Sequence, residues 1–238
     1  MTTSSRPVRQ NDNRQAAQTE LLQLSTLGRI STWLTAACVM LFSFLAFAVV
    51  THNDITLLDV RIVNWLADQA SATLTPLAFL ITTFGSPLFI TFVVLAGAIA
   101  SYVRFKSTRL VCLFLAVGIG AGAVMSLLKV IFHRARPVMA HPLDHEVGFS
   151  FPSGHATMSA ALYGLLILLV VTNVKRRWLR ITLSVLLSAL IFAIAVSRIY
   201  LGVHYPVDVT GGVCLGTAWT CMCFAIYAKA AERAQIPR

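Results

Sequence analysis

A histidine and an aspartate stand four residues apart in the segment 197–208, which reads Ser-Arg-Ile-Tyr-Leu-Gly-Val-His-Tyr-Pro-Val-Asp. That spacing can bring the carboxylate of Asp208 to the imidazole of His204. A carboxylate bonded to one ring nitrogen fixes the tautomer and leaves the other nitrogen free as a base or nucleophile. The alternative is that Asp208 only complements the dipole of a helix whose first turn contains Pro206.

A second histidine, His155, follows the sequence Pro152-Ser153-Gly154. Proline and serine favour a helix start, and glycine lets the backbone approach a ligand closely. The free N–H groups and the positive dipole end of such a helix can hold a phosphate. His155 would then lie in the first turn, beside the bound anion. An ordinary helix cap with an incidental histidine is the alternative.

Two cations, Lys129 and Arg136, are seven residues apart and precede Pro137. Seven residues is close to two helical turns, so both side chains, with His133 between them, are expected on one face of a helix that ends near Pro137. Two cations on one face can bind an anion. The alternative is snorkelling, in which cations at a helix end reach toward lipid headgroups.

The three segments together contain the groups that phosphoryl transfer without a metal requires. They contain the three cations Lys129, Arg136 and Arg198, a helix N-terminus, two histidines and one orienting carboxylate. Each of these features has an ordinary structural explanation when it is taken alone. Their occurrence together at the same face of the predicted bundle favours a site for a phosphate group.

Six further polar residues lie outside these motifs: His133, Arg134, His141, Asp144, His145 and Glu146. Histidines near acids could bind a metal, but a zinc site requires defined supporting geometry. We therefore expect these residues to line the entrance and shape specificity, with no metal and no cofactor.

Membrane-spanning helices must position the three segments, because the composition excludes an ordinary soluble domain. The chain is 57% hydrophobic and 12% charged, with a mean hydropathy of +0.77, whereas soluble domains are roughly a quarter charged. Its apolar residues form continuous runs, which favours helices over the alternating strands of a barrel. The fold class is therefore all-α and polytopic, with spans near 33–50, 75–103, 110–128, 156–174, 181–196 and 207–228. Residues 85–87 interrupt the second run, so a short external helix could precede that span.

The net charge of +10 is explained by topology and not by nucleic-acid binding. Most Lys and Arg residues fall in the N-terminal tail, in the connections near 104–109 and 175–180, and in the C-terminal tail. A six-span weave places these segments on one side, which the positive-inside rule makes cytoplasmic. Both termini are then cytoplasmic, and the three polar segments face the outside of the plasma membrane.

Outside the spans, residues 1–29 are polar and are expected to form a mobile cytoplasmic tail, and residues 30–238 the six-helix domain. The segment 53–72 alternates apolar and charged residues, which predicts an amphipathic helix in the membrane interface, acting as a lid or a brace. All five cysteines fall in predicted spans and are expected to pack as small apolar residues.

The order and spacing of the motifs resemble the phosphatidic acid phosphatase type 2 superfamily, which is related to vanadium haloperoxidases and bacterial acid phosphatases. The matching patterns are Lys-x6-Arg-Pro, Pro-Ser-Gly-His and Ser-Arg-x5-His-x3-Asp, and no motif position departs from them. The resemblance implies that His204 attacks phosphorus, that Asp208 orients it and that His155 protonates the leaving oxygen. It assigns phosphate binding to Lys129, Arg136, Ser153, Gly154 and Arg198, and gives Ser197 a lesser role, either in contacting the phosphate or in supporting the site.

The resemblance implies a metal-independent lipid phosphatase that forms a phosphohistidine and needs no protein partner. The motifs grip only the phosphate, which phosphatidic acid and a lipid A phosphate share, so the resemblance alone favours undecaprenyl pyrophosphate and phosphatidylglycerophosphate as substrates. Two other classes of protein remain as alternatives. An anion transporter would place its site at midplane within internal repeats, and a non-catalytic lipid binder would not need the second histidine.

Overall fold

Long helices make up most of the computed structural model, which describes residues 6–138, 143–144 and 146–235. The described residues contain no strand, and six of their segments are long and apolar enough to cross a membrane. The all-α prediction with six spans is therefore confirmed. The helices are α1 (Arg6–Thr51), α2 (Asp54–Ala67), α3 (Leu74–Thr83), α4 (Pro87–Phe105), α5 (Thr108–Phe132), α6 (Gly154–Asn173), α7 (Arg177–Tyr200) and α8 (Pro206–Gln235).

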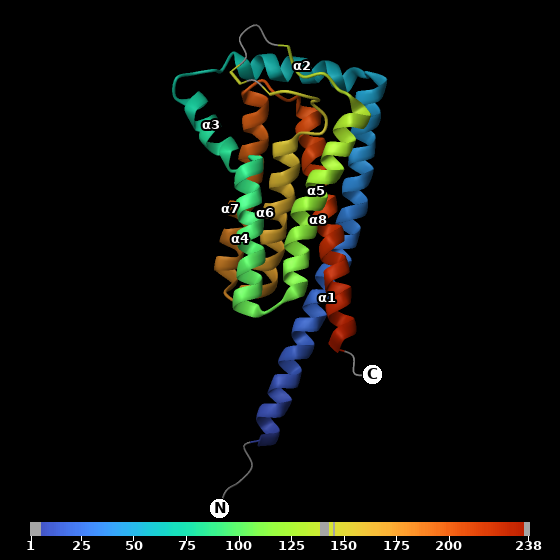
Figure 1. Ribbon diagram of the computed structural model, residues 1–238, viewed down its shortest axis with the longest axis vertical. Coiled ribbons are helices and arrows are strands. Elements are labelled where there is room, and N and C mark those ends of the chain that lie inside the picture. Colours follow the sequence, from blue (N-terminus) through green and yellow to red (C-terminus); the bar gives the residue numbers. More distant parts are fainter. Residues whose placement is uncertain (1–5, 139–142, 145, 236–238) are drawn as a thin grey trace, which may run out of the picture.

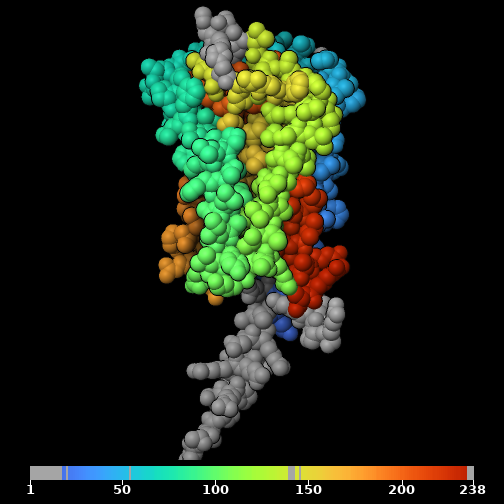
Figure 2. Space-filling model, viewed as in Figure 1, coloured from blue at the N-terminus to red at the C-terminus, as the bar shows by residue number. Residues whose placement is uncertain are grey.

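The spanning helices stand side by side in one bundle (Figure 1). Helix α1 begins and helix α8 ends at the same end of this bundle, while α2 lies across the opposite end. In the space-filling view, gold atoms of α6 are visible between α4 and α5, near the end that α2 crosses (Figure 2). We call that end of the bundle, where α6 and α8 begin, the α2 end.

Helices α6 and α8 approach each other closely because α8 presents glycines to α6. A Cβ atom on Gly212 would lie 2.7 Å from the carbonyl oxygen of Ser153, and one on Gly216 would lie 2.2 Å from that of Thr157. Small residues allow such close approach in membrane bundles. The contact fixes the start of α6 against the first turns of α8, where two of the predicted motifs meet.

The interruption predicted at residues 85–87 separates two helices, α3 and α4. Ser86 caps α4 by accepting a hydrogen bond from the Phe89 N–H, and Pro87 occupies the first turn. The hydroxyl of Tyr200 contacts both the Ser71 N–H at 3.2 Å and the Thr75 hydroxyl at 2.9 Å, so α3 is tied to the end of α7.

Helix α2 confirms the prediction of an amphipathic helix between the first two spans. Its start is capped by the side chain of Asn53, and it exposes Leu57 and Trp65 while it buries Val63 and Asp59. A buried aspartate on such a helix requires a partner, since an isolated buried charge is very costly. That partner lies in the functional site.

Two helix boundaries differ from the sequence predictions. Helix α1 begins at Arg6 instead of after a tail that ends at residue 29, because the Gln-, Ala- and Leu-rich run 15–24 favours a helix and Leu24 and Leu27 pack against the core. Helix α5 ends at Phe132 and not near residue 137, since His133 adopts a left-handed conformation with φ of 47°.

Candidate active site

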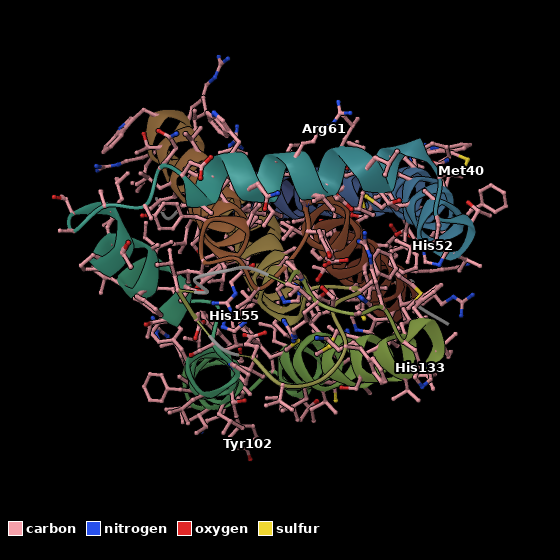
Figure 3. All side chains as sticks on the ribbon, turned by 90° about the horizontal axis from the view of Figure 1, so that it is seen from above. Met40, His52, Arg61, Tyr102, His133 and His155 are labelled. Atoms are coloured by element: carbon pink, nitrogen blue, oxygen red, sulfur yellow. The ribbon has the colours of Figure 1, made fainter. Side chains whose placement is uncertain are left out.

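The three motif segments meet at the α2 end of the bundle. Lys129 lies in the last turn of α5, His155 in the first turn of α6 and Arg198 in the last turn of α7. His204 lies between α7 and α8, and Asp208 lies in the first turn of α8. Figure 3 looks onto this end and shows His155 inside the ring of helices.

His204 and Asp208 are both fully buried, and their contact is made outside a regular helix. The Nδ1 atom of His204 lies 3.5 Å from Oδ2 of Asp208 and 3.4 Å from the hydroxyl of Ser150. The sequence predicts this pair from the four-residue spacing on a helix. Helix α8 begins only at Pro206, however, so helical spacing does not produce the contact. Asp208 is instead oriented by the backbone N–H of Tyr205, which donates to its Oδ2 at 2.9 Å.

The same aspartate is held by groups that the sequence analysis does not assign to the site. The hydroxyl of Ser150 donates to Oδ2 of Asp208, and Nη1 of Arg134 contacts the other oxygen, Oδ1, at 2.5 Å. The Nη2 atom of Arg134 contacts Asp59 of α2 at 2.7 Å. Arg134 therefore joins two buried carboxylates, one on α2 and one on α8.

A carboxylate, that of Glu146, lies between two of the predicted phosphate-binding cations. One oxygen is 2.5 Å from Nη2 of Arg198, and the other is 2.9 Å from Nη1 of Arg136. Both predicted histidines flank the same group at 3.5 Å, His155 through Nδ1 and His204 through Nε2. A single anionic group thus touches both arginines and both histidines, so these four side chains converge on one negative charge.

The electrostatics of Glu146 agree with an anion site. Burial raises the pKa of its carboxyl group, but the contact with His204 and the positive charge of Arg198 outweigh burial. The result is a pKa well below the ordinary value of 4.5. Glu146 is therefore anionic throughout the neutral range, and the surrounding groups stabilise negative charge.

Two buried polar atoms of predicted site residues have no hydrogen-bond partner among the described residues. They are the hydroxyl oxygen of Ser153 and the Nε atom of Arg198. Ser153 occupies the N-cap position of α6 without making a side-chain cap bond. A Cβ on the next residue, Gly154, would meet only Met125, at 3.7 Å, so the protein's own packing does not require glycine there. These features suit a ligand that binds at the start of α6.

Arg136 and Lys129 also bind backbone carbonyls of the connection that leads to α6. Lys129 Nζ donates to Phe149 O at 2.8 Å, while Arg136 donates to Gly148 O at 3.0 Å and to Val203 O at 2.9 Å. Because α5 ends at Phe132, the two cations do not share a helix face. Loop hydrogen bonds, and not helical periodicity, turn them toward the same place.

Ser197 does not join this arrangement. Its hydroxyl donates to the Ile194 carbonyl oxygen at 2.7 Å, within its own helix. This bond fits the supporting role among the two predicted for Ser197, and a phosphate contact of its hydroxyl stays a prediction. His133 is exposed and packs edge-on against Phe149, with the ring centroids 4.3 Å apart, while His141 and His145 lie outside the described residues.

Sequence reasoning placed Glu146 and Arg134 at the entrance, whereas both are inside the site. No fixed spacing identifies them, since both belong to the irregular connection between α5 and α6. The sequence feature that could have identified Glu146 and Arg134 as site residues is their charge. Acidic residues are scarce in this chain, and Asp59 on an otherwise amphipathic helix falls on the apolar side, where an unpaired charge would be costly.

Comparison with known proteins agrees with the class that the fold and site define, a multi-pass membrane protein in which cations and histidines gather at one end of the bundle. The family model of the PAP2 superfamily matches residues 109–232, which is more than half of the chain. The protein therefore belongs to the PAP2 superfamily, the phosphatidic acid phosphatase type 2 family that the motifs predict.

Relatives of known function match over shorter stretches. Phosphatidylglycerophosphatase B of Bacillus subtilis is 37% identical over 94 residues, which cover 38% of this chain and 44% of that protein. The undecaprenyl-diphosphatase BcrC of Bacillus subtilis is 31% identical over 100 residues, which cover 40% of this chain and 47% of that protein. The chain thus spans less than half the length of these two relatives.

A solved structure matches nearly the whole fold. The crystal structure of a transmembrane PAP2-type phosphatidylglycerolphosphate phosphatase from Bacillus subtilis has a TM-score of 0.72 and 25% sequence identity. The match covers 85% of this chain and 97% of that one. The arrangement of helices around the site is therefore that of a PAP2-type membrane protein.

Proposed function

We propose that the protein is a lipid phosphatase that transfers a phosphoryl group from a lipid phosphate or pyrophosphate to His204 and then to water. The observation that carries this proposal is the carboxylate of Glu146, which contacts Arg136, Arg198, His155 and His204 together. In the reaction, the phosphate of the substrate takes the place of this carboxylate. Its equatorial oxygens then face the cations that stabilise the charge of the transition state.

The two nitrogens of His204 divide the work of nucleophilic attack. Nδ1 faces Asp208 and Ser150, while Nε2 faces the anion position and lies 3.3 Å from Nη1 of Arg136. With the proton on Nδ1 and shared with Asp208, the lone pair of Nε2 can attack phosphorus. A P–N bond forms while a P–O bond breaks, the bond to the lipid oxygen in a lipid phosphate or the bond to the bridging oxygen in a lipid pyrophosphate, in which case a lipid phosphate leaves.

His155 contacts the anion position from the start of α6, where it can serve the leaving group. As an imidazolium it donates its proton to the departing oxygen, and the neutral ring then takes a proton from water that attacks the phosphohistidine. The second step breaks the P–N bond, releases inorganic phosphate and restores neutral His204. The site residues of this chain account for both steps.

The orientation follows from the distribution of charge between the two ends of the bundle. Basic residues concentrate at the end where α1 begins and α8 ends, which the positive-inside rule makes cytoplasmic. The site would then face the outside of the plasma membrane, with α2 in the interface. Undecaprenyl pyrophosphate and phosphatidylglycerophosphate are the favoured substrates, as the names of the two relatives suggest.

Phosphate release by the purified protein in detergent, with EDTA present, tests this function. Wild type and His204→Ala are compared on undecaprenyl pyrophosphate, phosphatidylglycerophosphate and phosphatidic acid. We expect release by the wild type and at least a ~10³-fold loss in the variant. Turnover by the wild type separates a catalyst from a lipid binder, and binding of inorganic phosphate by the variant shows that its arginines are still in place. Undiminished release by His204→Ala would remove His204 as the nucleophile.

A further inference from the structure

Arg134 lies two residues before Arg136, yet it does not face the anion position. Its guanidinium is mostly buried, with 11% of the side chain exposed, and it packs over the ring of Tyr205 with 4.4 Å from Cζ to the ring centroid. Nη1 binds Asp208 and Nη2 binds Asp59. The three groups that hold Arg134 come from α2, from α8 and from the residue just before α8.

Asp208 uses its two oxygens for different tasks. Oδ1 contacts Arg134, while Oδ2 accepts from Ser150 and from the Tyr205 N–H and faces Nδ1 of His204. A carboxylate with one oxygen held by a guanidinium cannot rotate that oxygen toward the imidazole. The plane of the carboxylate, and hence the direction of Oδ2, is therefore set by Arg134.

Asp59 completes the arrangement from α2. Only 1% of this residue is exposed, and its Oδ1 accepts a hydrogen bond from the Val207 N–H at 3.0 Å, in the first turn of α8. Its Oδ2 holds Arg134. One carboxylate of the external helix thus fixes both the start of α8 and the cation that orients Asp208.

We propose that Arg134 is a positioning residue for phosphoryl transfer, held by Asp59 of α2, which fixes Asp208 so that His204 presents Nε2 to phosphorus. This inference rests on the proposed function. Helix α2 then belongs to the catalytic apparatus, in addition to any contact with the membrane surface. Arg136 and Arg198 grip the phosphate, whereas Arg134 acts only through Asp208.

Kinetics of Arg134→Gln separate this role from phosphate binding and from general stability. We expect kcat to fall by ~10²-fold with KM changed by less than ~3-fold, because the phosphate-binding cations remain. The inhibition constant of inorganic phosphate, which needs the cations but no bond to Nε2, should stay within ~3-fold of the wild type. Arg134→Lys should recover part of kcat, since an ammonium can bind one carboxylate but not bridge two with a planar fork.

The role of α2 is tested by Asp59→Asn and by the double variant. Asp59→Asn should lower kcat by ~10-fold, and adding it to Arg134→Gln should cost little more, because both residues act through Asp208. Asp68→Asn is the matched control, since it is the same substitution at an exposed position at the end of α2. That control should keep the activity of the wild type.

Three outcomes would overturn the inference. The first is a kcat for Arg134→Gln within ~2-fold of the wild type. The second is loss of inorganic phosphate binding together with a large drop in Tm. The third is additive losses in the double variant, which would show that Asp59 of α2 does not act through Arg134. If the wild type itself releases no phosphate from any lipid, the proposed function fails. If the wild type is active and Arg134→Gln is equally active, this inference alone fails.

Discussion

Helix α7 carries arginines at both of its ends, and their surroundings are opposite. Arg176 and Arg177 at its start are exposed, whereas Arg198 in its last turn is only 1% exposed. Arg198 binds Thr82 at 2.8 Å, Asp144 at 3.4 Å and Glu146 at 2.5 Å. Snorkelling explains the exposed pair, but a buried and fully surrounded cation at a helix end indicates an anion site.

The same contrast holds between the two ends of the whole bundle. Basic residues near the end where α8 stops, such as Arg104, Lys106 and Arg109, are exposed. At the α2 end, Arg134 and Arg136 are largely buried and bind carboxylates. The number of charges at a bundle end therefore says less about function than their burial and partners do.

The largest effect is expected from breaking the contrast within α7. Arg198→Ala should lower kcat/KM by ~10²- to 10³-fold, because it removes a buried charge that stabilises the transition state and leaves Glu146 without its nearest partner. Arg177→Ala, the matched change at the other end of α7, should alter activity by less than ~2-fold. Steady-state phosphate release measures both, and equal losses in the two variants would contradict the distinction.

A smaller effect is expected from separating α6 and α8 near the site. Gly212→Ala places a methyl group 2.7 Å from the Ser153 carbonyl oxygen, a backbone atom that cannot yield easily. We expect a loss of ~1–3 kcal/mol in stability and a lower kcat. Gly164→Ala on α6 is the control, since its Cβ would meet Thr220 at 3.9 Å, an ordinary contact. Thermal unfolding in detergent distinguishes them, and equal Tm values would contradict the close packing.

The smallest effect is expected from neutralising the carboxylate in the anion position. Glu146→Gln should lower the inhibition constants of inorganic phosphate and orthovanadate by ~10-fold, because a negative group no longer competes for the cations. Product-inhibition assays measure this directly. Unchanged or raised inhibition constants would show that Glu146 does not occupy the phosphate position.

The pH dependence of stability has a defined sign for the same residue. A lowered pKa means that Glu146 stabilises the fold fully above its ordinary pKa of 4.5, and that this contribution is lost as the pH falls further. The Tm difference between wild type and Glu146→Gln should therefore be constant from about pH 8 to about pH 5 and shrink below about pH 4.5. A difference that shrinks already between pH 8 and pH 5 would contradict the lowered pKa.

The parts of the site that sequence could predict are those attached to helix ends. Pro152 to His155 fall at the start of α6 and Arg198 at the end of α7, because proline, capping residues and the apolar runs define those boundaries. The family motifs then identify the positions. The number of spans and the presence of helix α2 could also be predicted, since continuous apolar runs indicate the spans and an apolar rhythm indicates α2.

The connection between α5 and α6 could not be predicted in the same way. The positions of Arg134, Arg136 and Glu146 depend on a left-handed residue at 133 and on bonds to distant groups on α2, α7 and α8. Contacts between residues far apart in the sequence produce no short-range periodic pattern from which they could be predicted. The hydroxyl of Ser197 shows the converse, because its position within a motif did not reveal that it bonds its own helix.

Trapping the covalent intermediate tests the central claim most directly. Wild type is mixed with a lipid phosphate labelled in its phosphoryl group, quenched in base during turnover, and the labelled peptide is identified by mass spectrometry. The account predicts a base-stable, acid-labile phosphoramidate on His204, absent from His204→Ala. Label on another residue, or rapid turnover by the wild type with no label on the protein, would contradict a phosphohistidine at His204.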